Sequence, residues 1–148
     1  MRSEAVARSP AETLRICRPD DARGLGVETI VARSRGEVLH VFTGEIGPEI
    51  SQHSLQVDET NHIADTEFIG YLSHACAPNC RLDMRAFQLV ALKDMPAGEL
   101  LTIDYAATED RLFRQFACHC GAPQCRRWVT GRAEPPNVEG QAHLKGLS

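Results

Sequence analysis

The chain has 148 residues, of which 43% are hydrophobic and 24% charged, and its formal net charge is −4. These values are typical of one globular domain and exclude a fibrous repeat or a wholly disordered chain. Because no apolar run approaches the roughly 18 residues of a membrane helix and no secretory signal is evident, we expect an intracellular, soluble protein, cytoplasmic or, in a eukaryote, nuclear.

Short β-strands separated by turns dominate the predicted secondary structure. Apolar or alternating runs predict strands at 14–17, 23–30, 38–42, 54–57, 62–64, 88–92 and 100–103. Apolar residues recur at helical spacing only around 67–72 and 109–116. We expect residues 1–13 to form a loose leader and residues 132–148 a flexible tail. The sequence therefore predicts a mostly β protein.

Charge is distributed unevenly along the chain. Residues 46–105 carry three basic and nine acidic side chains. This acidic middle favours a basic protein or peptide as partner over the phosphate backbone of a nucleic acid, and a membrane partner is not expected. A solvated acidic surface is the alternative interpretation.

Three cysteines, Cys118, Cys120 and Cys125, lie within eight residues that also contain Gly and Pro. This spacing is typical of a structural zinc site, which requires four ligands in a tetrahedron. The fourth ligand could be His119, Cys17, Cys76 or Cys80, and a distant cysteine is preferable because His119 lies between two ligands. The alternative is that these cysteines are small buried hydrophobic residues.

Two further segments carry chemistry that their residues alone leave open. Residues 73–80 place His74 before two cysteines, a Pro and an Asn, so the segment is a constrained loop, half of a metal site or a Cys–His nucleophile pair. Residues 97–105 read as a turn and an apolar strand that ends at Tyr105, a position where tyrosine usually belongs to the core.

Four motifs follow one another along the chain. They are Gly24-Leu25-Gly26, Tyr71-Leu72-Ser73-His74-Ala75-Cys76-Ala77-Pro78-Asn79-Cys80, Gly98-Glu99-Leu100-Leu101-Thr102-Ile103-Asp104-Tyr105 and Cys118-His119-Cys120-Gly121 followed by Cys125-Arg126. Taken in order, they resemble the motifs of SET-domain protein-lysine methyltransferases with a post-SET zinc segment. The resemblance implies a SET domain at 14–106 and a post-SET segment at 107–131. It also implies the SET fold of short strands and small sheets, with a knot-like threading of the C-terminal segment.

The resemblance further implies a methyl transfer from S-adenosylmethionine to a lysine of a basic protein substrate. Tyr105 would be the catalytic residue, closing the lysine channel with its hydroxyl. One structural zinc ion would be bound by Cys76, Cys118, Cys120 and Cys125, which leaves Cys17 and Cys80 without a role. The cofactor would be bound by Arg23, Gly24, Leu25, Gly26, Ser73, His74, Phe116 and Ala117.

The sequence departs from the family pattern at several positions. Ser73 replaces the usual Asn, and Ile103 replaces the usual Phe or Tyr, a position that helps decide the number of methyl groups transferred. Only 25 residues separate Glu45 from Tyr71, and none is a tyrosine, so a partner subunit in a homodimer would complete the groove. A catalytically silent SET-like peptide-binding module with zinc is the alternative function, whereas the charge disfavours a zinc module for nucleic acid.

Overall fold

The computed structural model describes residues 13–20 and 24–147. Among these residues, the only helix longer than one turn is α2 (Val138–Lys145). There are also two 3₁₀ turns, η1 (Ile69–Tyr71) and η2 (Tyr105–Ala107). The strands are β1 (Leu14–Asp20), β2 (Gly24–Thr29), β3 (Val38–Val41), β4 (Glu45–Gly47), β5 (Leu55–Gln56), β6 (His62–Ala64), β7 (Ser73–His74), β8 (Cys80–Asp83), β9 (Gln88–Ala91), β10 (Thr102–Ile103), β11 (Phe116–Ala117) and β12 (Trp128–Val129).

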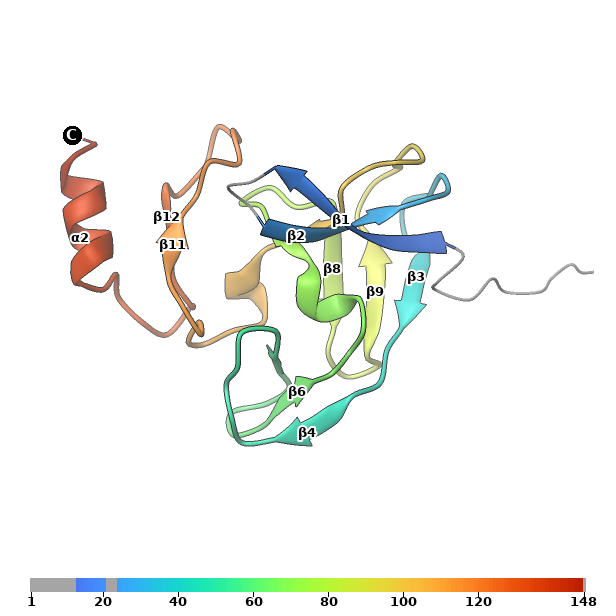
Figure 1. The fold of residues 1–148 in the computed structure, drawn as a ribbon, viewed down its shortest axis with the longest axis horizontal. Helices are drawn as coiled ribbons and strands as arrows, with labels where there is room; N and C mark the ends of the chain where they lie inside the picture. The colour runs from blue at the N-terminus through green and yellow to red at the C-terminus, as the bar shows by residue number, and fades with distance from the viewer. Residues whose placement is uncertain (1–12, 21–23, 148) are drawn as a thin grey trace, which may run out of the picture.

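These strands form five small sheets within the described ranges. β1 and β2 pair as an antiparallel ribbon, β3-β9-β8 and β4-β6-β5 are three-stranded antiparallel sheets, and β11 pairs with β12. β7 and β10 form the only parallel pair among them. Figure 1 shows β1 and β2 crossing above β8 and β9, with β4 and β6 at the opposite edge of the body. The predicted mostly β architecture of short strands is confirmed.

Buried apolar side chains from most of these sheets meet in one core. The alternation of β2 puts Val27 fully inside, and Leu89 on β9 and Leu101 before β10 are equally buried. Phe42, which follows β3, is 2% exposed and contacts Phe87 with ring centroids 5.6 Å apart. Because each sheet is too small to bury a face alone, the shared core fixes their relative positions.

Asn79 fastens the loop of residues 73–80 to the strand that precedes Tyr105. Its carboxamide accepts a hydrogen bond from the backbone N–H of Thr102 and donates one to the carbonyl of Leu100, both at 2.8 Å. Its own backbone N–H donates to the Thr102 hydroxyl at 3.0 Å. These bonds, together with the parallel pairing of β7 and β10, place His74 beside Tyr105.

The two predicted helices at 67–72 and 109–116 were wrong. The first shortens to the 3₁₀ turn η1, because Leu72 is already extended at φ −60° and ψ 138°. In the second, the backbone N–H groups of Asp110 and Leu112 donate to side chains instead of carbonyls one turn back. Asp110 donates to the carboxamide oxygen of Gln56 at 2.6 Å, and Leu112 donates to Glu134 at 3.1 Å. Tertiary contacts therefore override the helical periodicity.

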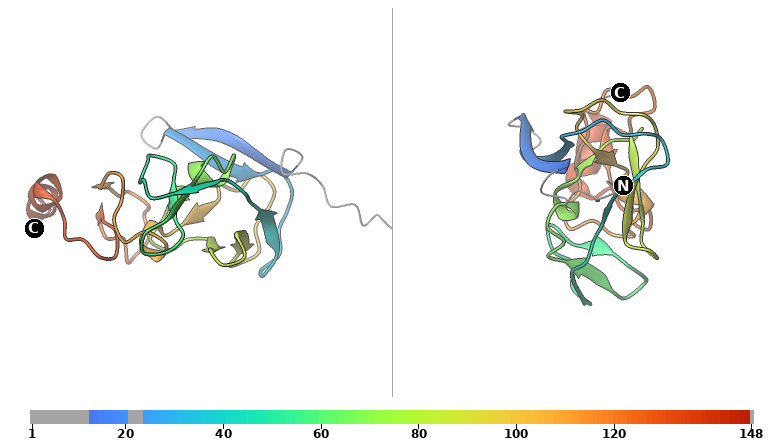
Figure 2. Two further views of the ribbon diagram at one scale, coloured as in Figure 1. Left: turned by 90° about the horizontal axis from the view of Figure 1, so that it is seen from below. Right: turned by 90° about the vertical axis from the view of Figure 1, so that its right-hand side faces the viewer.

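The expected flexible tail contains the helix α2, which the sequence analysis missed. The Asn137 side chain caps it by accepting the N–H of Gly140 at 2.8 Å. Gly140 is buried because the Trp128 indole occupies the space where a Cβ would lie. In Figures 1 and 2, α2 lies at one end of the molecule, beside β11 and β12.

Within the described residues, no helix is long and apolar enough to cross a bilayer.

Candidate functional site

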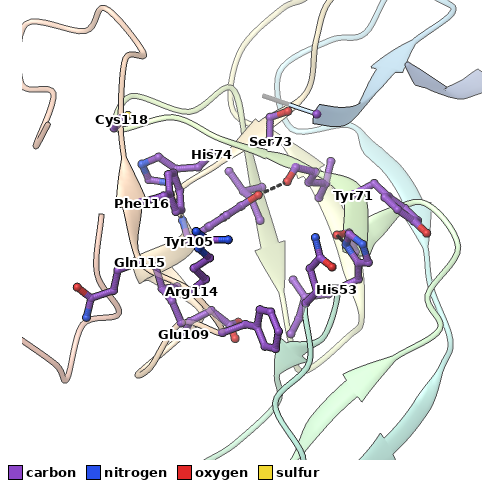
Figure 3. Close-up of a pocket in the computed structure, with 18 of the residues that line it drawn as sticks. His53, Tyr71, Ser73, His74, Tyr105, Glu109, Arg114, Gln115, Phe116 and Cys118 are labelled. Carbon is purple, nitrogen blue, oxygen red and sulfur yellow. Dashed lines mark hydrogen bonds between the residues drawn. The ribbon is translucent and has the colours of Figure 1, made fainter. Parts of the chain in front are cut away.

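A cavity of about 930 Å³ opens between the β2 end of the body and the β11–β12 hairpin. Its walls come from the start of β2, residues 50–55, η1 and β7, Tyr105, and residues 112–120. In Figure 3, Tyr105, Phe116 and Glu109 lie on one side of the cavity, and His53 and Tyr71 lie on the other. The cavity thus collects residues from at least five separate parts of the sequence.

Tyr105, the first residue of η2, projects into this cavity. Its hydroxyl donates a hydrogen bond of 2.6 Å to the backbone carbonyl of Leu72, drawn as a dashed line in Figure 3. Burial raises the pKa of the phenol to about 12, and the nearby charge of Glu109 adds to the shift. Tyr105 therefore stays protonated at neutral pH, and its orientation is fixed by backbone.

Three aromatic rings, those of His74, Tyr105 and Phe116, pack edge to face at the inner end of the cavity. Their centroids are 5.2 Å apart for His74 and Tyr105, 5.8 Å for His74 and Phe116, and 5.7 Å for Tyr105 and Phe116. Such pairs contribute stabilisation beyond the area they bury. The cluster joins the loop of residues 73–80, the end of β10 and the start of the hairpin.

The His74 ring is a buried acceptor. Its Nδ1 accepts the backbone N–H of Tyr105 at 3.1 Å, and its Nε2 lies 3.5 Å from the Cys76 sulfur. Burial lowers the pKa of His74 to about 4, with Arg126 adding to the shift and Asp104 opposing it. The imidazole is therefore neutral at pH 7, and its accepting Nδ1 places its proton on Nε2.

The sulfur atoms of Cys76, Cys118, Cys120 and Cys125 all lie within 4.8 Å of one another. The Cys76 and Cys118 sulfurs are 3.9 Å apart. A tetrahedral zinc site with Zn–S bonds of about 2.3 Å has ligand sulfurs about 3.8 Å apart, so the spacing fits this metal. The structure thus brings the distant Cys76 to the three local cysteines, whereas His119 is exposed and outside this group.

Arg126 couples this cysteine cluster to the residue before Tyr105. Its backbone N–H donates to the Cys76 sulfur at 3.4 Å, a contact typical of thiolate ligands. Its guanidinium binds the Asp104 carboxylate through two hydrogen bonds, one of them 2.9 Å long. Although burial alone would raise it, the pKa of Asp104 is lowered by these bonds to Arg126. Arg126 therefore connects the cysteine cluster to the backbone segment that carries Tyr105.

The structure brings most of the predicted cofactor residues to the cavity. Its lining includes six of them, Gly24, Leu25, Ser73, His74, Phe116 and Ala117, along with Tyr105. Gly26 is buried and does not line it, and Arg23 lies outside the described residues. Gly24 has φ +72°, a conformation that favours glycine.

Ser73 carries a buried, unsatisfied polar atom in the cavity wall. The residue is 7% exposed, and its hydroxyl oxygen has no hydrogen-bond partner among the described residues. Buried hydroxyls are normally paired, so this atom is available to a ligand in the cavity.

Several polar residues of the cavity were not predicted from the sequence, among them His53, Glu109 and Arg114. His53 stacks on Tyr71 with ring centroids 4.4 Å apart, and its Nδ1 is 2.9 Å from the carbonyl of Gly70. Thus an aromatic ring from residues 46–70 does reach the cavity, although that segment lacks a tyrosine. No motif marks these positions, because tertiary contacts alone bring them to the cavity wall.

Residues 8–106 match the family model described as SET domain. Histone-lysine N-methyltransferase 2D of Homo sapiens is 33% identical over 78 residues, which cover 46% of this chain and 1% of that protein. Methyltransferase flvH of Aspergillus flavus is 27% identical over 126 residues, which cover 83% of this chain and 71% of flvH. Histone-lysine N-methyltransferase ash1 of Drosophila melanogaster is 26% identical, covering 85% of this chain and 7% of ash1.

Solved structures share the fold. KRYPTONITE in complex with mCHG DNA and SAH matches with a TM-score of 0.63 and 24% identity, covering 78% of this chain and 28% of that one. KRYPTONITE in complex with mCHH DNA, an H3(1–15) peptide and SAH matches with a TM-score of 0.61 and 23% identity, covering 78% and 29%. The chain therefore spans only a small part of most of these relatives.

Proposed function

We propose that this chain, which belongs to the SET domain family, transfers a methyl group from S-adenosylmethionine to the side-chain amine of a lysine in a protein. One observation carries the proposal. The hydroxyl of Tyr105 is held by the Leu72 carbonyl inside a cavity that also collects Gly24, Ser73 and Phe116. The relatives named as histone-lysine methyltransferases support the same activity.

S-adenosylmethionine supplies an electrophilic methyl group on a sulfonium. Solved relatives of this fold hold SAH, the compound that remains after that methyl group has left. We propose that the cofactor is bound by Gly24, Leu25, Ser73, His74, Phe116 and Ala117, with the free Ser73 hydroxyl as one hydrogen-bonding group. Gly26 is buried in β2 and does not line the cavity, so it is left out of this set. Arg23, outside the described residues, stays a prediction.

The reaction needs a neutral lysine amine, since only that form has a lone pair. A free lysine has a pKa of about 10.4, and desolvation in the cavity would lower it. The donor would supply its methyl group to this lone pair and would keep the C–S electron pair on its sulfur. Tyr105, protonated at neutral pH and tied to Leu72, would orient the amine, so most of the rate would come from alignment.

The four cysteines would give zinc a structural role. They supply all four ligands, which leaves no open position for a substrate or an activated water. Because Cys118 directly follows β11, the metal would hold Phe116 and Ala117 against His74 and thereby close the cofactor end of the cavity. The chain's own residues thus supply binding and orientation, and zinc supplies order.

We propose a basic protein, such as a histone, as the substrate class. The acidic residues of 46–105 and the histone-lysine methyltransferases among the relatives support this choice. The post-SET segment is proposed to span 107–131, as its cysteine cluster suggests.

Calorimetric titration of zinc-loaded protein with S-adenosylmethionine tests the proposal. An active enzyme should bind about one equivalent, because the predicted cofactor residues of the described chain line one cavity. Absence of binding would favour the alternative, a catalytically silent peptide-binding module, for which the replacement of the usual Asn by Ser73 is the supporting observation.

A further inference from the structure

Glu109 is a buried acid on the cavity wall. The residue is 7% exposed, and its backbone N–H donates to the carbonyl of Tyr105 at 2.9 Å. Figure 3 shows Glu109 on the same side of the cavity as Tyr105. Its charge acts on Tyr105 strongly enough to contribute to the raised pKa of the phenol. The carboxyl group is therefore within electrostatic reach of the hydroxyl that we propose orients the substrate amine.

The Glu109 carboxyl group has few partners that compensate its charge. One oxygen accepts the backbone N–H of Gln56 at 2.8 Å, and the Thr108 side chain also hydrogen-bonds to the group. No basic side chain of residues 13–20 and 24–147 forms an ion pair with it. His62 and Arg132 attract it from farther away, and Arg132 is itself paired with Asp110 at 2.6 Å.

Burial dominates this balance and raises the pKa of Glu109. A buried carboxylate without an ion pair is costly, and a cation that enters the cavity would offset that cost. The other charged residues of the cavity wall, Arg18, Arg114 and Glu139, are exposed, so water screens them. Among the acidic and basic side chains that line the described cavity, Glu109 is thus the one that is buried.

We propose that Glu109 selects a cationic side chain for this cavity by binding the ammonium group of the incoming lysine. The inference rests on the methyltransferase function proposed above and names a specificity-determining residue for it. Because only the neutral amine can attack, the bound ammonium would first lose one proton to water in the cavity. The same carboxylate would then face the positive charge that passes from sulfur to nitrogen during methyl transfer, and it would stabilise the methylated ammonium product.

Binding of n-butylammonium, which reproduces the lysine side chain, tests the inference without an identified substrate. Its affinity is measured by NMR titration of the zinc-loaded full chain and compared with that of 1-butanol, a neutral analogue of similar size. We expect the wild-type protein to prefer the ammonium. Glu109→Gln should weaken ammonium binding at least about tenfold, the cost of losing one charge-assisted hydrogen bond.

Two variants serve as matched controls. Glu109→Asp keeps the charge and should keep the preference for the ammonium, whereas Glu45→Gln removes an exposed carboxylate of β4 outside the cavity and should bind as the wild type does. Should Glu109→Gln fail to fold, the wild-type protein still provides the test, because saturating n-butylammonium should lower the pKa of the Glu109 carboxyl measured by NMR.

Specific outcomes would overturn the inference. They are equal wild-type affinity for ammonium and alcohol, no loss of ammonium affinity in Glu109→Gln, or an unchanged Glu109 pKa. Methyl transfer is measured separately, so the two proposals fail separately. A protein that transfers methyl groups but ignores n-butylammonium contradicts the role of Glu109 alone. One that prefers n-butylammonium but binds no S-adenosylmethionine contradicts the proposed function alone.

Discussion

The hydroxyl of Tyr105 donates to the backbone carbonyl of Leu72 over 2.6 Å, although 33 positions separate the two residues in sequence. A backbone acceptor cannot rotate away as a side chain can, so the proton of the phenol is directed at a fixed point. The lone pairs of the phenolic oxygen are then left for a group in the cavity. This hydrogen bond fixes the orientation of the Tyr105 hydroxyl, on which its proposed role in methyl transfer depends.

Tyr105→Phe should reduce methyl transfer at least about 100-fold, the usual cost of removing one preorganised polar group from an active site. The fold should remain, with a loss of about 1 kcal/mol for one hydrogen bond. Incorporation of labelled methyl groups and thermal unfolding provide the two measurements. Tyr71→Phe removes the chain's other tyrosine hydroxyl, which bonds no described residue, and should have a much smaller effect. Full activity of Tyr105→Phe would refute the assigned role.

Cys76→Ser should lower the zinc content from about one ion per chain to a small fraction, because a serine hydroxyl is a poor substitute for a thiolate ligand. Metal analysis after dialysis against a weak chelator measures this. Cys17→Ser is the matched control, since Cys17 is a half-buried thiol outside the cluster. Unchanged zinc in Cys76→Ser would show that the metal uses other ligands.

Gly140→Ala should displace α2, because the new methyl group would collide with the indole of Trp128. Overpacking of this kind costs about 1–3 kcal/mol. Gly146→Ala, at the other end of the helix, has its nearest atoms at 3.6 Å and should be neutral or slightly stabilising. Trp128 is the only tryptophan, so its fluorescence reports α2 directly. Equal emission spectra for the two variants would contradict this packing.

The raised pKa of Glu109 predicts a pH-dependent difference in stability between the wild type and Glu109→Gln. The ordinary pKa is 4.5, and burial makes the folded protein hold this proton to higher pH than the unfolded chain does. The unfolding free energy of the wild type should therefore fall relative to that of Glu109→Gln as the pH rises through 4.5 and then the folded pKa. Urea unfolding of both proteins from pH 4 to 8, an interval of about four pH units, measures the difference. A difference that stays constant would contradict the burial of this charge.

Local patterns in the sequence predict some features of the site and not others. The spacing of Cys118, Cys120 and Cys125 indicates a metal by itself, because the three thiols lie within one short bend. The proposed fourth ligand, Cys76, could be assigned only through the family resemblance, since the carboxamide of Asn79 and the pairing of β7 with β10 determine where its loop lies.

Other features depend on contacts that no local pattern encodes. Glu109 lies in a segment with helical periodicity, yet its carboxylate binds β5 and the helix does not form. The start of α2 could have been predicted from the sequence, since Asn137 after two prolines is a typical N-cap. Its stability, however, comes from Gly140 packed on Trp128, which the sequence does not reveal.

The most direct test of the central claim is methyl transfer itself. Zinc-loaded protein is incubated with methyl-labelled S-adenosylmethionine and basic proteins, histones among them, and modified residues are located by mass spectrometry. The account predicts label on lysine side chains with the wild type and almost none with Tyr105→Phe. Failure of the wild type to label any lysine, or equal labelling by both proteins, would contradict it.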